Sequence, residues 1–438
     1  MKKGVRQFAF EILCNIYENN AFSNLTIDAV LNNSEKEIDE RDKKLLTNIV
    51  YGTVERTITL DYITNLYLDK PIQNLPLEPL VILRMSAYQL IFMDRIPPYA
   101  IIDEAVKIIK YGRAPHFANL VNAVLRKVNG YDVNDIDLIK DVSIKYSCPQ
   151  HLINMWAAHY GNENMMGIVK SMNGPVPVCA HVNTLKCTEN KFIRNFERSG
   201  GEAQRTALEN ALIITYSGAI TQIQEFQEGW FHVQDMASQY CAQALDPKSG
   251  DLIFDMCSAP GGKAFTMAEL MENEGEIRCF DVYPQRLSLI DEGARRLGID
   301  IIKTMENDAA QFNSALPMAD KILCDVPCSG LGTIRKKPEI RYKNLDYIDT
   351  LPAIQYQILE TSSKYLKPGG TLVYSTCSLN KKENDQVVDR FLNENSDFEA
   401  VDVLPSLRRG IPGSKYLTLF PHIHDTDGFF IAKLVKKR

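Results

Sequence analysis

The length, composition and charge of the chain limit the classes of protein to which it can belong. It has 438 residues, 45% of them apolar and 24% charged, which is typical of a globular protein with two or three domains. No apolar run approaches the roughly 20 residues that a membrane span requires, and charges at Arg6, Glu11 and Glu18 make the N-terminus an amphipathic helix instead of an export signal. We therefore expect a cytoplasmic protein. The net charge of −6 does not by itself favour a nucleic-acid binder.

Residues 1–132 are predicted to form an all-α bundle. Apolar residues recur three and four positions apart, and Pro or Gly residues fall between the segments FAFEILCNIY, KLLTNIVYGTVERTITLDYITNLYL, LVILRMSAYQLIFM and IIDEAVKIIKYG. Residues 133–238 are predicted to begin with more helix and to continue as a small α+β module. Its expected elements are the strands VCAHVNT and ALIITYS and the helix ENKFIRNFERSGG.

Residues 239–438 alternate between strands and helices, which predicts an α/β domain with a doubly wound parallel sheet. The expected strands are DLIFDMC, EIRCFDV, IIKTMEN, DKILCDV and GGTLVYST. Two closing strands, YLTLF and DGFFIAKLVK, are expected at the end.

Acidic residues follow successive strands of this predicted sheet, at Asp255, Asp281, Asp308 and Asp325. A single acid at a strand end means little, because Asp is common in turns. The carboxyl ends of parallel strands share one edge, however, and ligands bind at that edge. We therefore expect a ligand site there, with Asp281 on a ribose.

The segment DMCSAPGGKAF predicts a tight turn between the first strand and a helix. Gly261 and Gly262 lack a Cβ atom, so a ligand can approach the backbone closely. The spacing is neither G-x-G-x-x-G nor that of a P-loop, so a phosphate cradle is not indicated. An ordinary strand-to-helix turn remains the alternative.

Two of the ten cysteines, Cys328 and Cys377, follow strands that end on the same side of the predicted sheet. The chain has no C-x-x-C pair and no clustered His and Cys residues, which argues against a metal site. A disulfide is disfavoured in a reducing compartment, and strand-end loops are seldom core. The interpretation that remains is a nucleophile with a helper thiol.

The motifs DMCSAPGGK, CDVPCSGLG and STCSL together resemble the RNA cytosine-C5 methyltransferases that use S-adenosylmethionine. The resemblance runs from about residue 143 to the C-terminus and includes GWFHVQDMASQ and DGFFIAKL. The first 130 residues resemble the RNA-binding NusB fold in LRMSAYQL, IPPYAIIDEAV and FANLVNAVLRKV. This pairing of domains resembles the bacterial 16S ribosomal RNA methyltransferases of the RsmB (Sun) type. Ser258, Ala264, Val326 and His181 depart from the usual pattern of the family.

The resemblance implies three domains: a NusB-like bundle, a small RRM-like module and a Rossmann-like methyltransferase domain. It implies methylation of C5 of one cytidine in 16S ribosomal RNA through a covalent bond between Cys377 and C6. Cys328 would then assist proton removal and release, Asp325 would bind the cytosine edge, and Lys263 would position groups or supply charge. Cofactor contacts would come from Cys257, Ser258, Ala259, Pro260, Gly261, Gly262, Lys263, Asp281, Asp308 and Asp325.

The expected partner is 16S ribosomal RNA, bound by the helical domain and by the basic run Arg335–Lys343 through phosphate contacts. We expect a monomer. Two alternatives stay open: an exocyclic amino methyltransferase, and a NusB-like RNA-binding or regulatory protein whose methyltransferase domain is catalytically silent.

Overall fold

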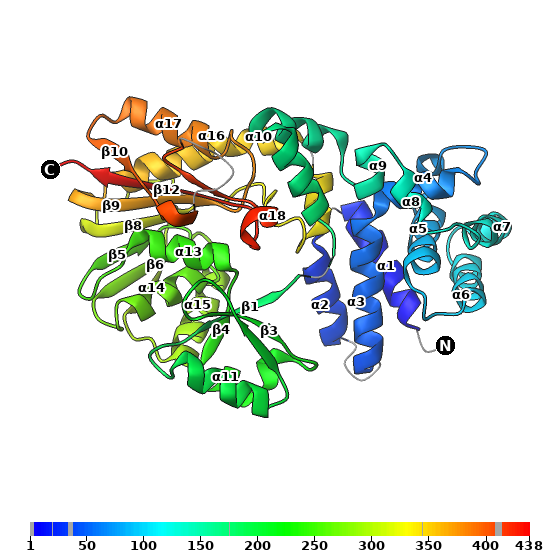
Figure 1. Ribbon diagram of the computed structural model, residues 1–438, viewed down its shortest axis with the longest axis horizontal. Coiled ribbons are helices and arrows are strands. Elements are labelled where there is room, and N and C mark those ends of the chain that lie inside the picture. The colour runs from blue at the N-terminus through cyan, green and yellow to red at the C-terminus, as the bar shows by residue number, and fades with distance from the viewer. Residues whose placement is uncertain (1–3, 20, 34–37, 175, 344, 408–413) are drawn as a thin grey trace. The chain divides into compact units, whose positions relative to one another are not determined.

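The computed structural model describes residues 4–19, 21–33, 38–174, 176–343, 345–407 and 414–438 (Figure 1). They fall into two compact units. The helical unit comprises Met1–Asn173 together with Ile334–Lys343, and the sheet unit comprises Gly174–Thr333 together with Asn344–Arg438. In the described ranges, no helix is both long enough and apolar enough to cross a membrane.

The helical unit is a bundle in which the helices between Val5 and Val128 turn apolar side chains to a common core, as the sequence spacing predicts. In α3, for example, Leu46, Ile49, Val50 and Val54 are all completely buried. Its helices are α1 (Val5–Asn19), α2 (Ser23–Asn33), α3 (Glu40–Glu55), α4 (Thr57–Asn65), α5 (Leu77–Phe92), α6 (Pro98–Tyr111), α7 (Ala118–Val128), α8 (Asp135–Leu138), α9 (Val142–Tyr146) and α10 (Gln150–Ser171), with short 3-10 helices η1 (Ile72–Asn74) and η2 (Pro115–Phe117).

Arg341 belongs to the basic run that was predicted to contact RNA, but its side chain is buried. The 3-10 helix η4 (Pro338–Tyr342) lies in the helical unit, and its Arg341 is completely buried. The Arg341 guanidinium donates to the carbonyl oxygens of Glu55 (3.0 Å) and Ser147 (2.9 Å) and to Asn173 Oδ1 (3.2 Å). The prediction of a phosphate contact is therefore wrong for Arg341, because its guanidinium is buried and its Nη1 and Nη2 atoms donate to acceptors inside the protein.

The sheet unit begins with a small module around an antiparallel sheet of order β2-β3-β1-β4. Phe192, Phe196 and Phe231 fill the space between this sheet and helix α11. The polar EAQR of β2 and the three residues of β4 were not predicted as strands, because neither has an apolar alternation long enough to be recognised. The elements are β1 (Val178–Val182), α11 (Glu189–Arg198), β2 (Glu202–Arg205), β3 (Ala211–Thr215), η3 (Ile220–Gln222), α12 (Gln224–Gln227) and β4 (Phe231–Val233).

The second sheet of this unit has the order β10-β12-β9-β8-β5-β6-β7, with β11 paired to β12. Strands β7, β6, β5, β8 and β9 are parallel, whereas β12 is antiparallel to β9. The predicted parallel sheet and closing strands are thus present, and β10 is an addition. The strands are β5 (Leu252–Asp255), β6 (Glu276–Asp281), β7 (Ile302–Glu306), β8 (Ala319–Asp325), β9 (Leu366–Thr376), β10 (Phe398–Val401), β11 (Leu417–Leu419) and β12 (Phe429–Lys436).

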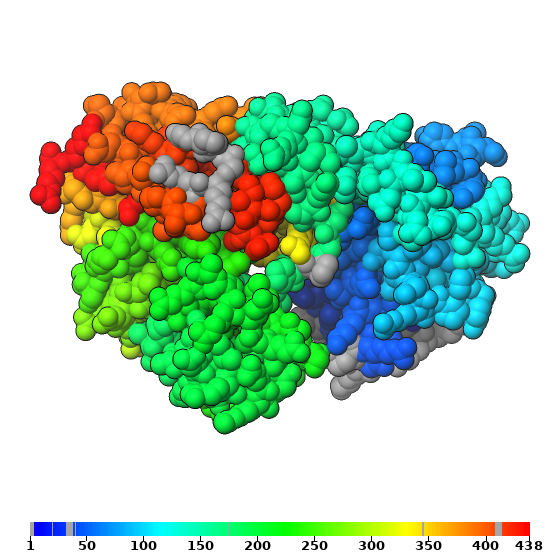
Figure 2. All heavy atoms as spheres, viewed as in Figure 1, coloured from blue at the N-terminus to red at the C-terminus, as the bar shows by residue number. Residues whose placement is uncertain are grey.

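Helices cover both faces of this sheet (Figure 1). Successive strand residues alternate between two cores, so that Ile253 packs on the side of α13, α14 and α15 while Phe254 packs on the side of α16 and α17. In the space-filling view, side chains close the gap that the ribbon leaves between the small module and this sheet (Figure 2). The helices are α13 (Met236–Leu245), α14 (Gly262–Leu270), α15 (Pro284–Leu297), α16 (Leu345–Ser363), α17 (Asp385–Glu394), η5 (Pro405–Leu407) and α18 (Pro421–His424).

Candidate functional site

The carboxyl ends of four neighbouring parallel strands carry acidic residues. Strands β5, β6 and β8 end at Asp255, Asp281 and Asp325, and Asp308 follows the end of β7 by two residues. Because these strands are parallel and adjacent, their acids lie along one edge of the sheet, as expected. This edge is where an open parallel sheet binds its ligand.

The turn between β5 and α14 is held by backbone hydrogen bonds within itself and to β6. The Gly261 amide donates to the Ser258 carbonyl oxygen (2.8 Å), and the Ser258 amide donates to the Phe280 carbonyl oxygen (2.8 Å). Gly261 has φ +100°, a conformation that favours glycine, and a Cβ atom there would lie only 2.8 Å from the Phe265 ring. The turn therefore requires Gly261 for a structural reason as well as for any ligand.

Two buried polar atoms at this turn make no hydrogen bond of ordinary geometry in the described part of the chain, although the Ser258 side chain lies near enough to Asp255 to offset part of the rise that burial causes in its pKa. They are Asp255 Oδ1 and Ser258 Oγ. A buried acceptor and a buried hydroxyl without partners are costly unless a ligand completes them. They fit a polar ligand such as S-adenosylmethionine, whose amino, carboxylate and hydroxyl groups can occupy such positions. Asp255 was counted among the strand-end acids but was not predicted to contact the cofactor.

Asp281 and Asp308 are partly engaged by their own turns. Asp281 accepts from the Tyr283 amide (3.0 Å) and from Arg286 Nη1 (3.4 Å). Asp308 accepts from the Ala310 amide (3.0 Å) and from Gln311 Nε2 (2.8 Å). Asp281 is buried and Asp308 is exposed, and both carboxylates keep acceptor capacity beyond these bonds. Their contacts with a cofactor remain predictions.

Lys263 and Asp325 form an ion pair at the end of β8. Lys263 Nζ lies 2.6 Å from Asp325 Oδ2, and the Ser375 hydroxyl donates to Asp325 Oδ1 at 2.8 Å. Burial lowers the pKa of Lys263, but Asp325, Cys241 and Asp255 together raise it by more, so the ammonium stays charged. These two contacts fix the orientation of the Asp325 carboxylate. Ser375 was not recognised from the sequence, because a serine inside an apolar strand carries no distinctive signal.

Cys328 and Cys377 are brought together from adjacent parallel strands. Asp325 at the end of β8 is paired in register with Ser375 near the end of β9, and the two cysteines follow shortly after. Their sulfur atoms are 3.2 Å apart, and both thiols are free and half-buried. The neighbouring Cys377 and burial raise the pKa of Cys328 well above its ordinary value. Cys328 therefore keeps its proton at neutral pH.

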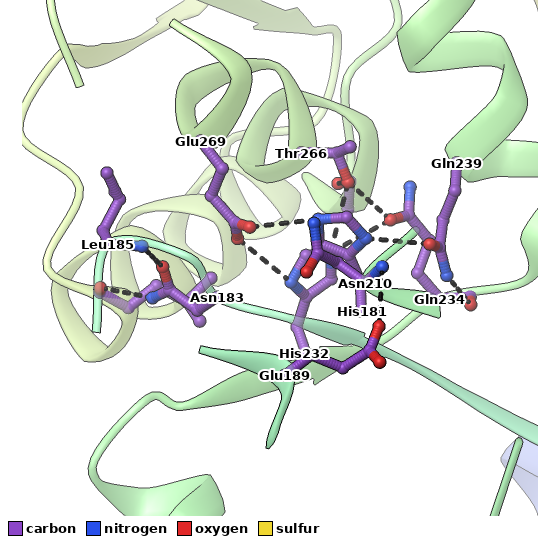
Figure 3. A network of polar contacts seen from close by, with 12 residues as sticks. His181, Asn183, Leu185, Glu189, Asn210, His232, Gln234, Gln239, Thr266 and Glu269 are labelled. Atoms are coloured by element: carbon purple, nitrogen blue, oxygen red, sulfur yellow. Dashed lines mark hydrogen bonds and ion pairs between the residues drawn. The ribbon is translucent and has the colours of Figure 1, made fainter. Parts of the chain in front are cut away.

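A buried polar network lies behind the turn and connects α14 to the small module (Figure 3). Thr266 Oγ1 donates to Gln234 Oε1 (2.6 Å), and His181 Nε2 lies 3.0 Å from Glu269 Oε2. His232, also in this network, is neutral because burial lowers its pKa to about 3. The network fixes the helix that begins with Gly262 and carries Lys263. His181, which departs from the family pattern, is a buried residue of this network.

The burial of Asp255 leads to a prediction about stability. Burial raises the pKa of Asp255 from 3.8 to about 7. A carboxyl whose pKa is higher in the folded state binds its proton more tightly there, so stability falls as the pH rises from about 4 to 7. Asp255→Asn, which keeps a neutral side chain, should therefore unfold at a higher denaturant concentration than the wild type at pH 8. At pH 4 the difference should be small.

Asp320 provides a matched control for this measurement, at the opposite end of the same sheet. It accepts from the Leu252 amide (3.0 Å) and pairs with Lys367 (2.7 Å). Despite some burial, these contacts lower its pKa, so its contribution is present at high pH and is lost on acidification. Asp320→Asn should thus destabilise more at pH 8 than at pH 4. An equal response of the two variants to pH would contradict the assignment for Asp255.

Comparison with known proteins places this arrangement in a family. The model described as "16S rRNA methyltransferase RsmB/F" matches residues 242–435, the NusB family model matches residues 3–130, and a ferredoxin-like domain of the same methyltransferases matches residues 148–221. A probable ribosomal RNA small subunit methyltransferase B of Bacillus subtilis is 36% identical over 448 residues, covering 100% of this chain and 99% of that protein. The chain belongs to the RsmB-type ribosomal RNA methyltransferases.

Two solved structures are similar to this chain in fold. The crystal structure of PH0851 is 28% identical and covers 100% of both chains with a TM-score of 0.83. NSun6 from Pyrococcus horikoshii, solved with SFG, is 26% identical and covers 66% of this chain and 98% of its own, with a TM-score of 0.60. The expected NusB-like bundle, small α+β module and Rossmann-like domain are therefore confirmed.

Proposed function

We propose that this protein transfers a methyl group from S-adenosylmethionine to C5 of a cytidine in small-subunit ribosomal RNA, through a transient bond between Cys377 and C6. The observation that supports this most directly is the distance of 3.2 Å between Cys328 Sγ and Cys377 Sγ, beside the Lys263–Asp325 pair. Cytosine C5 is a weak nucleophile, and a thiol that adds to C6 makes the ring electron-rich at C5.

The cofactor is assigned to the edge of the sheet at β5 and β6. The turn from Cys257 to Lys263 and the strand-end acids Asp281 and Asp308 are the residues that hold it. Asp255 Oδ1 and Ser258 Oγ, the buried atoms that make no hydrogen bond of ordinary geometry in the described ranges, are added to this set. When bound, S-adenosylmethionine supplies an electrophilic methyl group. Among the relatives, NSun6 was solved with SFG, which supports a cofactor of this type.

In the proposed reaction, each bond that forms is matched by one that breaks. The Cys377 thiolate adds to C6, and the C5–C6 π electrons move towards C5. C5 takes the methyl group as the bond from that group to the cofactor sulfur breaks, its electron pair staying on sulfur, and C5 then loses its hydrogen as a proton to the Cys328 thiolate. The C6–S bond breaks, its electron pair returns to Cys377, and the double bond is restored. One methyl group has entered the ring and one proton has left it.

Cys328 must lose its own proton before it can accept one from C5. Its raised pKa is caused first by Cys377 and then by burial, with Glu383 and Asp325 contributing further negative charge. Once Cys377 has become a neutral thioether, the largest of these causes disappears. The proton of Cys328 can then pass to solvent, and the thiolate that remains serves as the base.

Asp325 is assigned to the edge of the cytosine. Its two oxygens each receive one protein donor, Ser375 Oγ and Lys263 Nζ, which leaves further lone pairs free to accept from the base. Because Lys263 and Ser375 hold the carboxylate in place, it need not reorganise as charge develops on the ring. Lys263 acts in this scheme by positioning Asp325.

Ribosomal RNA is proposed as the substrate because the curated relatives are named as ribosomal RNA small subunit methyltransferases. A base that meets a pocket at the edge of a sheet must leave its stack, which favours loops and flipped nucleotides. The helical unit, which matches the NusB family, is proposed to bind the surrounding RNA.

Small-subunit RNA that carries tritium at C5 of its cytidines tests the proposal. Each methylation at C5 should release one tritium to water, and only when S-adenosylmethionine is present. An exocyclic amino methyltransferase would methylate this RNA without releasing tritium. A catalytically silent domain would do neither, and either result would overturn the proposal.

A further inference from the structure

The side chain of Glu383, in the segment between β9 and α17, is completely buried and accepts hydrogen bonds through both oxygens. Glu383 Oε2 accepts from the Ser329 amide (2.8 Å) and from Gln355 Nε2 (3.1 Å). Glu383 Oε1 accepts from Ser329 Oγ (2.6 Å), Ser378 Oγ (2.7 Å) and Asn380 Nδ2 (3.2 Å). One carboxylate thus receives five donors.

Two of these donor residues adjoin the thiols in the chain. Ser329 follows Cys328 after β8, and Ser378 follows Cys377 after β9. The two serine hydroxyls also lie 2.9 Å from each other. Glu383 therefore joins the turn that carries one thiol to the turn that carries the other, alongside one backbone bond from the Gly332 amide to the Cys377 carbonyl oxygen (2.9 Å).

The rest of the segment holds the Cys377 turn from the same side. Asn384 Nδ2 donates to the Ser378 carbonyl oxygen (2.9 Å), and the Thr376 hydroxyl donates to Asn384 Oδ1 (2.5 Å). The hydroxyl of Tyr374 donates to the carbonyl oxygen of Glu383 itself (2.6 Å). Glu383 is therefore held on both its main chain and its side chain.

Glu383 has no cationic partner in the ranges that the structure describes. The neighbouring Lys382 pairs with Asp349 instead, at 2.8 Å. A buried carboxylate without a counter-ion is costly, and here the cost is offset by five donors that are all formally neutral. Such a group is expensive to keep for packing alone, since apolar residues of similar volume would fill the space.

We propose that Glu383 is a positioning residue, which sets the separation and orientation of the Cys328 and Cys377 thiols by holding Ser329 and Ser378. Its importance for turnover rests on the proposed two-thiol function, whereas its effect on thiol geometry does not. Its negative charge also contributes to the raised pKa of Cys328, after Cys377 and burial. Glu383 thereby helps to keep Cys328 protonated while Cys377 is the nucleophile.

The geometric claim is tested without RNA, on the full-length protein. The bifunctional reagent dibromobimane links two thiols only when they lie close together, and mass spectrometry identifies the linked peptides. Wild-type protein should link Cys328 to Cys377. Glu383→Ala should slow this reaction at least about tenfold, because the two turns lose their common acceptor. Asp320→Asn, a carboxylate variant at the other end of the sheet, should react like the wild type.

Two milder variants keep the claim testable if Glu383→Ala does not fold. Ser378→Ala removes only the link to the Cys377 turn and should slow the linking reaction about threefold. Glu383→Gln should react within about threefold of the wild type, since the serine hydroxyls can reverse and accept from an amide. A normal rate in folded Glu383→Ala, or in Ser378→Ala, would overturn the inference.

Measurements of turnover distinguish a failure of this inference from a failure of the proposed function. Glu383→Ala should lose about 10²-fold in kcat, as expected for thiols displaced by about 1 Å, while its affinity for S-adenosylmethionine by calorimetry stays unchanged. If the linking rates follow the prediction but wild-type protein releases no tritium from C5, Glu383 keeps its role and the cytosine chemistry is wrong. If wild-type protein releases tritium, and Glu383→Ala links its thiols and turns over at the normal rate, the cytosine chemistry stands and the role of Glu383 is wrong.

Discussion

Replacing Cys377 by Ala should lower the rate of methyl transfer by roughly 10³-fold or more, because no other group can form the bond to C6. The half-buried Cys377 thiol lies at the end of β9, and its only sulfur neighbour in the described part of the chain is Cys328. In the proposed scheme Cys328 is the base that removes the C5 proton, so it does not form this bond. The measurement is incorporation of labelled methyl groups into small-subunit RNA.

Cys14→Ala is a suitable control for this experiment. Cys14 is also a half-buried free thiol, but it lies on α1 in the helical unit, where burial raises its pKa to about 12. Its removal should leave methyl incorporation within about twofold of the wild type. Substantial incorporation by Cys377→Ala would eliminate this residue as the nucleophile and with it the covalent mechanism.

Replacing Cys328 by Ala should trap the protein on its RNA. The Cys377–C6 bond can break only after the C5 proton has been removed, and without Cys328 the remaining base is water. Loss of a positioned base slows such a step by about 10²–10⁴-fold. A protein–RNA band that survives denaturing electrophoresis should therefore accumulate after S-adenosylmethionine is added.

The double variant Cys328→Ala, Cys377→Ala separates this trap from other tight binding. It should give no covalent band, because the attacking thiol is absent. If Cys328→Ala by itself gives only free protein and free RNA while methylation continues at the normal rate, proton removal belongs to another group.

Much of the sheet unit could be predicted because its sequence signals are local. Short apolar runs that end in Asp255, Asp281 and Asp325 mark strands β5, β6 and β8, and the helices between them require parallel strands. The strands that were missed, β2, β4 and β10, have three or four residues each. They pair because a neighbouring strand offers hydrogen bonds, and this information lies outside their own sequence.

The two thiols show how much of the site can be predicted from local sequence. Their positions after strand ends predict that Cys328 and Cys377 lie on one edge of the sheet. The order of the strands then decides whether they meet, and β8 and β9 are neighbours in register. That pairing brings the two turns together, and their sulfur atoms lie 3.2 Å apart.

The sequence by itself determined which residues stand at the edge of the sheet, because a run of apolar residues sets where a strand ends and parallel strands end on one side. Only the tertiary structure decided which charged residues are buried. In the printed sequence Arg341 and Glu383 lie in lysine-rich runs that look solvent-exposed, yet both are completely buried. Their partners include residues as distant in the chain as Glu55 for Arg341 and Ser329 for Glu383. Burial of a charge depends on donors and acceptors that the fold gathers from remote segments, and no local pattern records them.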